Sequence, residues 1–146
     1  VVDGFYVGDF NLARPATRPN PDAPRLVQLA RERAGRVILA TNPIFPANGV
    51  NTRLSWIGLS LSDFDYVTTY ENSHYCKPNP MYYTELAHVM KLDPARCLTV
   101  GNDIAEDGAA RKAGFDVHLV TDCLLGDPAQ LSDFPHSTFS ELLALI

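Results

Sequence analysis

The stretch VGNDIAEDGAARKAG (Val100–Gly114) decides the fold prediction, because it joins an apolar run to a cluster of acids and then to a helix-like segment. Three carboxylates, at Asp103, Glu106 and Asp107, fall close together, and Gly114 ends the segment. Two interpretations are open at this point. The acids can cap a helix and favour its dipole, or they can supply oxygen ligands for a divalent cation. The two roles can share residues.

Short apolar runs alternate with helix-like patterns on both sides of this stretch. The predicted strands cover residues 37–40, 65–70, 97–100 and 116–120, and the predicted helices cover residues 23–34, 47–58, 80–90, 104–113 and 139–146. Asp22 is the expected N-cap of the first helix, and the Pro-rich residues 11–24 are expected to form a loop or linker. This alternation predicts an α/β fold, with a Rossmann-like three-layer core around a largely parallel sheet.

Length and composition narrow the possible functions. The 146 residues are enough for about one domain. The net charge of −5 and the lack of a basic block argue against a nucleic-acid partner. No apolar run approaches the roughly 20 residues that a membrane span needs, so no membrane partner is expected. The odd count of three cysteines favours a reducing compartment, and we expect a cytoplasmic protein.

Polar side chains follow three of the predicted strands, where ligands bind in parallel α/β sheets. Thr41 and Asn42 follow the first strand, Lys77 follows the second, and Asp103 and Asp107 follow the third. Carboxylates suit Mg²⁺, and an ammonium and a hydroxyl suit the oxygens of a phosphoryl group. The i, i+4 spacing of the two acids predicts that they share one face of a helix. The glycine at position 101 allows close backbone approach.

Each of these residues also has a purely structural interpretation. Asp103 taken alone is more often an N-cap than a metal ligand. Thr41 before Asn-Pro can belong to a turn, and Lys77 can be an ordinary loop lysine. His74 is expected in a loop or at the surface with no role, and three aromatic residues are expected to pack rather than bind: Trp56, Tyr82 and Tyr83. The order of the polar residues along the strands is what favours a site.

This set of residues resembles motifs II, III and IV of the haloacid dehalogenase superfamily. The resemblance lies in Thr41 after VILA, Lys77-Pro78 before a helix, and Gly-Asn-Asp-x-x-x-Asp at 101–107, and it covers about residues 20–122. It implies a phosphatase that uses Mg²⁺ and acts on a small phosphorylated substrate. Thr41, with the backbone N–H of Asn42, would bind the phosphoryl group. Lys77 would stabilise the nucleophile and the phosphate, while the metal residues would be Asp103, as a ligand, and Asp107, in support.

The sequence departs from the family at motif I, an apolar strand followed by Asp-x-Asp-Gly-Thr that supplies the nucleophile. The nearest string, VVDGF at residues 1–5, would place Val at the nucleophile position. We therefore expect a carboxyl-terminal part of a longer enzyme, without the nucleophile and without the central strand of the family's 3-2-1-4-5 sheet. Residues 1–18 would be the tail of a cap domain or a linker, and residues 19–146 the core domain.

A second hypothesis comes from a different class of protein. The chain can be a non-catalytic metal- or phosphate-binding module, or a regulatory α/β module, in which the acids bind a ligand or only cap a helix. A phospho-acceptor receiver domain fits less well, since it carries an acid pair after its first strand, where this chain has Thr41.

Overall fold

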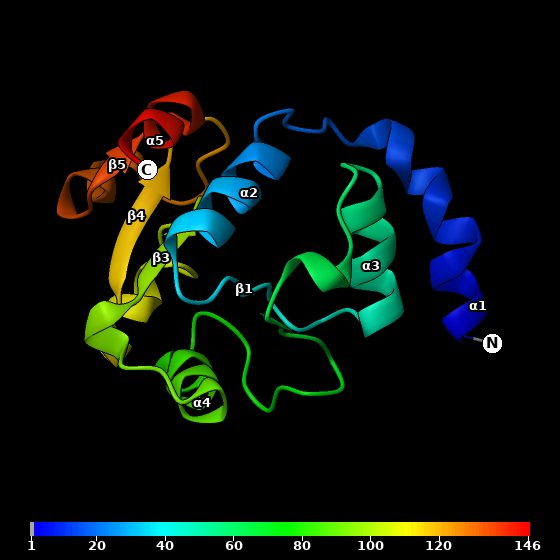
Figure 1. The fold of residues 1–146 in the computed structure, drawn as a ribbon, viewed down its shortest axis with the longest axis horizontal. Coiled ribbons are helices and arrows are strands. Elements are labelled where there is room, and N and C mark those ends of the chain that lie inside the picture. The colour runs from blue at the N-terminus through cyan, green and yellow to red at the C-terminus, as the bar shows by residue number, and fades with distance from the viewer. Residues whose placement is uncertain (1) are drawn as a thin grey trace. The chain divides into compact units, whose positions relative to one another are not determined.

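The structure is a computed structural model that describes residues 2–146 (Figure 1). The chain divides into two compact units, one ending at Ser73 and the other beginning at His74, and each is described by itself. The first unit contains α1 (Val2–Val7), η1 (Asp9–Ala16), α2 (Ala23–Arg33), β1 (Ile38–Leu39), α3 (Ala47–Ser55), η2 (Leu61–Asp63) and β2 (Tyr66–Val67), where η denotes a 3₁₀ helix. The second contains α4 (Pro80–Met90), η3 (Pro94–Arg96), β3 (Leu98–Gly101), η4 (Gly108–Ala113), β4 (Asp116–Val120), η5 (Pro128–Asp133), β5 (His136–Ser137) and α5 (Phe139–Leu145).

All paired strands run parallel, as the alternating sequence pattern predicts. In the first unit β1 pairs with β2, with Ile38 opposite Tyr66. In the second unit the order is β3-β4-β5, with Val100 of β3 opposite His118 of β4 (Figure 1). The α/β fold class is therefore confirmed. The central strand that the family resemblance implies, between the predicted strands 37–40 and 97–100, stays a prediction.

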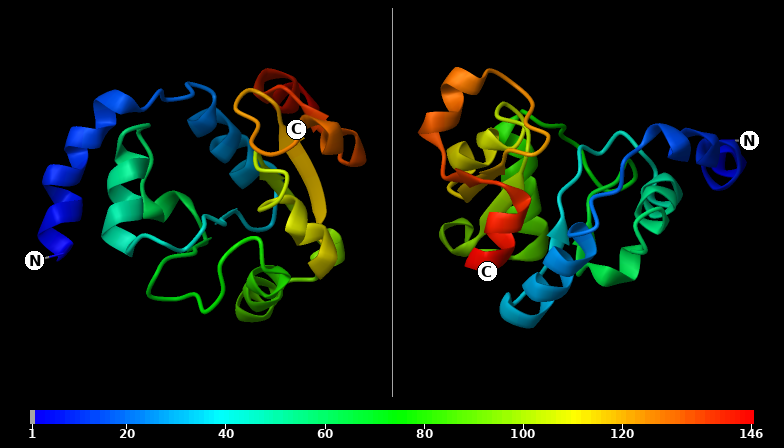
Figure 2. Two further views of the ribbon diagram at one scale, coloured as in Figure 1. Left: turned by 180° about the vertical axis from the view of Figure 1, so that it is seen from behind. Right: turned by 90° about the horizontal axis from the view of Figure 1, so that it is seen from above.

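The first unit is built around an apolar cluster and an aromatic cluster. Val50, Leu54 and Val67 form the buried apolar cluster. Helices α1 and α3 lie side by side (Figures 1 and 2). An aromatic cluster joins the amino-terminal segment to the two ends of α3. It consists of Phe5, Tyr6, Phe10, Phe45 and Trp56, and the centroids of neighbouring rings are 5.3–6.0 Å apart. The three aromatic residues of residues 1–18 thus pack onto the first unit.

The second unit has its core around β4 and α4. Leu119 of β4 is fully buried, and Tyr82 and Tyr83 of α4 are each 1% exposed. The rings of the two tyrosines meet edge to face with centroids 4.9 Å apart. Burial of large apolar side chains of this kind is the main favourable term in folding. As expected, all three aromatic residues assigned to packing, including Trp56, are buried.

Several predicted boundaries are wrong. Residues 11–24 were predicted to form a loop or linker, but residues 11–16 belong to the 3₁₀ helix η1. The helix predicted over 104–113 is a series of turns followed by the 3₁₀ helix η4. The strand predicted over 65–70 shrinks to the two residues of β2. Asp22 occupies the N-cap position of α2, but its side chain makes no capping hydrogen bond, and its own N–H donates to Asn20.

Candidate functional site

A buried ion pair lies at the centre of the candidate site in the second unit. The Nζ atom of Lys77 is 2.6 Å from Oδ1 of Asp107, and the two side chains are 7% and 9% exposed. Lys77 comes from the loop before α4, whereas Asp107 comes from the segment after β3. Two charges taken out of water are costly unless they are paired and hydrogen-bonded, so the pair fixes these two segments to each other.

The second oxygen of Asp107 binds the loop that follows β3. Its Oδ2 atom accepts hydrogen bonds from the backbone N–H of Asn102 at 2.9 Å and of Asp103 at 3.0 Å. A Cβ atom at Gly101 would lie 2.1 Å from the same oxygen, so only glycine fits there. This confirms the expectation that Gly101 allows a close approach. Both oxygens of Asp107 thus have partners within the protein, Lys77 for one and two backbone N–H groups for the other, and the carboxylate stabilises the conformation of the loop.

Asp103 starts the turn that leads to Asp107. Its Oδ1 atom accepts from the backbone N–H groups of Ala105 and Glu106, each at 2.9 Å. The N–H of Asp107 donates to the carbonyl of Asp103 at 2.9 Å, so one α-type turn joins the two acids. Asp103 is half-buried, and within residues 2–146 no hydrogen bond to its Oδ2 atom is found. This is the carboxylate oxygen best suited to meet a cation.

Aromatic rings of α4 surround the ammonium of Lys77. Its Nζ atom lies 5.7 Å from the ring centroids of both Tyr82 and Tyr83, within the range of cation–π attraction. The hydroxyl of Tyr83 donates to the carbonyl of Glu106 at 3.0 Å. Burial, and next the negative charge of Asp107, raise the pKa of the Tyr83 phenol far above its usual range. Tyr83 is therefore a neutral hydrogen-bond donor at any physiological pH.

Thr41 and Asn42 lie in the first unit, directly after β1. Their backbone is held by Thr68, which is 3% exposed. The Thr68 hydroxyl donates to the carbonyl of Thr41 at 2.7 Å, and the Thr68 N–H donates to the carbonyl of Leu39 at 3.1 Å. The structure thus brings Lys77, Asp103 and Asp107 together within one unit, and it places the two phosphate-binding candidates at the carboxyl end of β1.

Two other polar residues of the strand ends have structural roles. The carboxylate of Glu71 accepts from the backbone N–H of Ala47 at 3.1 Å and so caps α3. Hydrogen bonds, first from Thr69 and then from Ala47, lower the pKa of Glu71. His74 is exposed, as expected, and its Nδ1 atom is 2.5 Å from Glu85.

Sequence reasoning missed the two hydroxyls that hold the site. Thr68 and Tyr83 were not singled out as supports, because each acts by donating to a carbonyl that lies far away in the sequence, 27 residues for Thr68 and 23 for Tyr83. Such a partner leaves no local spacing signal. Only the apolar environment of Tyr83 could be expected from the helical pattern of α4.

The donor set of the candidate site suits Mg²⁺ rather than a softer metal. Across residues 2–146 no group of three or more His, Cys, Asp or Glu side chains is arranged to hold a metal ion. Mg²⁺, however, commonly takes one or two carboxylates and completes its shell with water and phosphate oxygens. Asp103 offers one such oxygen, and Asp107 holds the loop that presents it. The residues therefore fit Mg²⁺ bound mainly through Asp103.

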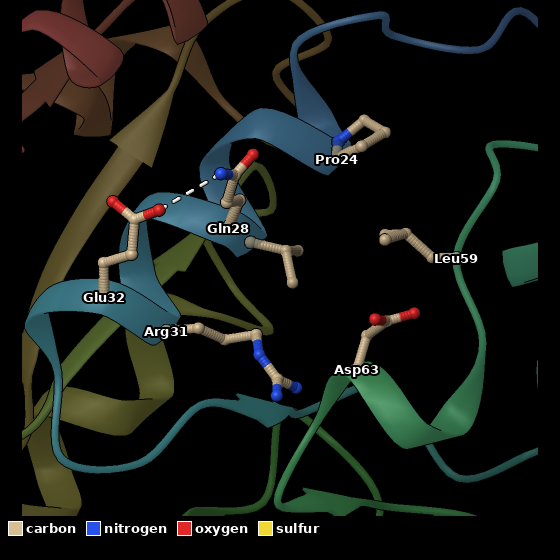
Figure 3. Close-up of a pocket in the computed structure, with 7 residues that line it drawn as sticks. Pro24, Gln28, Arg31, Glu32, Leu59 and Asp63 are labelled. Atoms are coloured by element: carbon tan, nitrogen blue, oxygen red, sulfur yellow. Dashed lines mark hydrogen bonds between the residues drawn. The ribbon is translucent and has the colours of Figure 1, made fainter.

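The first unit also contains an open hollow of about 520 Å³, lined by residues of α2 and by Leu59 and Asp63, the last of which belongs to η2 (Figure 3). Its charged groups already have partners in the protein. Arg31 donates to the carbonyl of Ser62 at 3.3 Å, and Gln28 donates to Glu32 at 3.1 Å. None of the predicted site residues lines this hollow. The candidate site of the second unit is therefore taken to be the loop at the carboxyl end of β3.

In the part of the chain that the structure describes, no helix has the length and apolar character of a membrane span. Searches of curated proteins find no match to the sequence.

Three solved structures are similar in fold. They are a predicted phosphoglycolate phosphatase from Haemophilus somnus (TM-score 0.71, 22% identity), a HAD phosphatase from Thermococcus onnurineus (0.70, 19%) and an L-2-haloacid dehalogenase from Xanthobacter autotrophicus (0.60, 20%). The matches cover 88%, 93% and 87% of this chain, but only 57%, 61% and 60% of those proteins. At these identities the likeness shows the fold alone, and it includes both phosphatases and a dehalogenase.

The sequence itself also matches a family. The model of the haloacid dehalogenase-like hydrolases matches residues 2–114, which include Thr41, Lys77, Asp103 and Asp107. The match covers well over half of the 146 residues, so this chain belongs to the family of haloacid dehalogenase-like hydrolases.

Proposed function

We propose that this hydrolase is a Mg²⁺-dependent phosphomonoester hydrolase of the phosphatase type that works through an aspartyl-phosphate. The observation that carries the proposal is the loop after β3, where Asp107 is clamped by Lys77 while Asp103 keeps an oxygen without a protein partner among residues 2–146. The dehalogenase branch usually lacks the first acid of this motif and needs no metal. The presence of Asp103 therefore favours phosphate chemistry.

The proposed roles follow from the chemistry of each side chain. Mg²⁺ bound at Asp103 would offset the negative charge of a phosphoryl group. Lys77 holds Asp107 and contributes positive charge, and Asp107 orients the backbone that carries Asp103. Preorganised groups of this kind stabilise developing charge without reorganising during the reaction. Thr41 and Asn42 are the proposed phosphate-binding residues of the first unit, and their assignment rests on the family resemblance.

The nucleophile is the part that these residues do not supply. The 146 residues contain no Asp-x-Asp-Gly-Thr, so we propose that this chain carries the phosphate- and metal-binding part of the site only. A small phosphorylated compound is the proposed substrate. We expect the 146-residue chain to show no turnover of p-nitrophenyl phosphate in Mg²⁺, whereas turnover by that chain would overturn the missing-nucleophile part of the proposal.

The metal-binding part is tested on this chain by NMR. Titration with Mg²⁺ should shift the amide signals of Asn102 and Asp103, and Asp103→Asn should remove the response. Asp9→Asn, which changes an exposed acid of η1, is the matched control and should titrate like the unchanged protein. The proposal fails if Asp103→Asn titrates like the unchanged chain.

The product of the complete gene provides the test of catalysis. It should hydrolyse p-nitrophenyl phosphate in the presence of Mg²⁺, and Asp103→Asn should abolish that hydrolysis. Activity that persists in this variant would contradict the assigned role of Asp103.

One observation favours a second candidate, a non-catalytic binding or regulatory module. The acids of the loop accept hydrogen bonds from four backbone N–H groups in total, two at Asp103 and two at Asp107. They would stabilise the loop even without a ligand. If the complete gene also encodes no Asp-x-Asp-Gly-Thr and its product shows no hydrolysis, this candidate replaces the phosphatase.

A further inference from the structure

We infer that Tyr83 is a positioning residue for the cation site, a role that rests on the proposed function of Asp103 and goes beyond the ligands themselves. The hydroxyl of Tyr83 donates to the carbonyl of Glu106 at 3.0 Å. Glu106 lies between the two acids of the loop, directly before Asp107. This hydrogen bond therefore joins α4 to the one turn that carries the candidate metal ligand.

The ring of Tyr83 is fixed well enough to act as an anchor. The residue is 1% exposed, and its ring centroid lies 4.9 Å from that of Tyr82 and 5.8 Å from that of Phe115. A side chain packed on several sides has few other rotamers available. The position of the hydroxyl is thus set by the core of the second unit and not by the loop that it binds.

The loop is also held from outside α4, since the side chain of Asn102 donates to the carbonyl of Cys123 at 2.7 Å and the N–H of Ile104 donates to the carbonyl of Leu125 at 3.0 Å. Tyr83 adds the hydrogen bond to α4. Asp103 binds the N–H groups of Ala105 and Glu106, and Asp107 binds those of Asn102 and Asp103. These bonds shape the turn but do not fix it to α4. Lys77, in the segment before α4, holds the carboxylate of Asp107, and Tyr83 holds the backbone next to it.

The same tyrosine also contacts the ion pair through its ring. Its centroid is 5.7 Å from Nζ of Lys77. The hydroxyl of Tyr83 therefore contacts the turn that carries Asp103, and its ring contacts the lysine that pairs with Asp107. Substitution by phenylalanine separates the two contacts, because it keeps the ring and removes only the hydroxyl.

The test is Tyr83→Phe, with Ser137→Ala as the matched control. Ser137→Ala also removes one hydrogen-bonding hydroxyl of the second unit, the partner of His118 at 2.7 Å. Amide hydrogen exchange is measured by NMR without metal, at Asn102 and Asp103 in the loop. The N–H of Leu119, in the buried strand β4, reports unfolding of the unit as a whole.

We expect exchange at Asn102 and Asp103 to rise about three- to tenfold in Tyr83→Phe, the ratio that corresponds to one neutral hydrogen bond. Exchange at Leu119 should change less than exchange in the loop. The dissociation constant for Mg²⁺, measured by titration of the same amides, should rise by a similar factor. Ser137→Ala should leave both loop exchange and Mg²⁺ affinity at the values of the unchanged chain.

The role of Tyr83 in the loop and its role in metal binding are tested separately. If loop exchange in Tyr83→Phe equals that of the unchanged chain, or rises only as much as exchange at Leu119, Tyr83 does not position the loop. If the exchange rises but the Mg²⁺ affinity of a chain that binds the ion is unchanged, the role in metal binding is overturned. If the unchanged chain does not bind Mg²⁺, the proposed function fails, and the exchange data still decide whether Tyr83 anchors the loop.

Discussion

Lys77 and Asp107 form a pair in which each side chain is less than a tenth exposed, with 2.6 Å between Nζ and Oδ1. Removal of one partner or the other affects a different set of contacts. Asp107 keeps two backbone N–H donors on its other oxygen, whereas the lysine is bordered by two aromatic rings. This asymmetry predicts different costs for removing one partner or the other.

Removal of the acid should therefore cost more stability than removal of the lysine. Asp107→Leu removes the carboxylate that pairs with Lys77 and leaves the N–H groups of Asn102 and Asp103 without their acceptor, and we expect it to lower the free energy of unfolding by about 3–5 kcal/mol. Lys77→Met leaves a carboxylate that still accepts two hydrogen bonds, and its cost should be smaller. Urea denaturation of both variants checks the order. Equal losses would show that the backbone donors do not stabilise the carboxylate.

Gly101 should not tolerate even the smallest side chain. In Gly101→Ala the new Cβ atom would lie 2.1 Å from Oδ2 of Asp107, and that oxygen cannot move without losing its two hydrogen bonds. We expect a loss of about 1–3 kcal/mol in unfolding free energy, typical of overpacking, together with loss of the Mg²⁺ response. Gly35→Ala is the control, because a Cβ there meets no atom within 4 Å. Equal stability of the two variants would contradict the clash.

The sequence pattern predicted correctly those helices and strands that are marked by residues within or next to them. Helix α4 and strand β4 have the predicted bounds, 80–90 and 116–120. Asn79 caps α4 through its side chain and Pro80 starts it, a start signal that can be read from the sequence. Strand β5 was missed because it has two residues and no apolar pattern, and it forms by pairing with β4.

The prediction of a helix over residues 104–113 is wrong, and the reason bears on the candidate site. Asp103 and Asp107 have the spacing of one helical face, but their carboxylates bind nearby backbone N–H groups. Short acidic side chains compete with the helical ladder in this way. The types of residue at the site could therefore be predicted, whereas the pairing of Lys77 with Asp107 depends on two segments that meet only in the folded unit.

The single tryptophan offers a probe of the amino-terminal segment. The Nε1–H of Trp56 donates to Oδ1 of Asn11 at 3.0 Å. Asn11→Ala should cost about 1 kcal/mol of unfolding free energy, as expected for one hydrogen bond, and should shift the emission maximum of Trp56. Leu12→Ala removes a side chain of a residue that is 81% exposed and should change neither. An unchanged emission spectrum in Asn11→Ala would show that the segment is not attached through this bond.

His118 should make the stability of the second unit depend on pH. Burial, and next the nearby His136, lower the pKa of His118 below its usual 6.5, and its Nε2 atom is 2.7 Å from Oγ of Ser137. The folded protein therefore binds this proton less readily than the unfolded chain does. The stabilising contribution is complete above the unfolded pKa and is lost as the pH falls toward and below the folded pKa.

The expected result is a lower unfolding free energy at pH 5 than at pH 7.5, with a smaller difference in His118→Gln. Thermal or urea denaturation at several pH values measures it. His88→Gln is the matched control, because the side chain of His88 is exposed on α4, and this variant should keep the pH dependence of the unchanged chain. If His118→Gln shows the full pH dependence, another group is responsible, and the half-buried contact between His118 and Ser137 does not disfavour the charged imidazole.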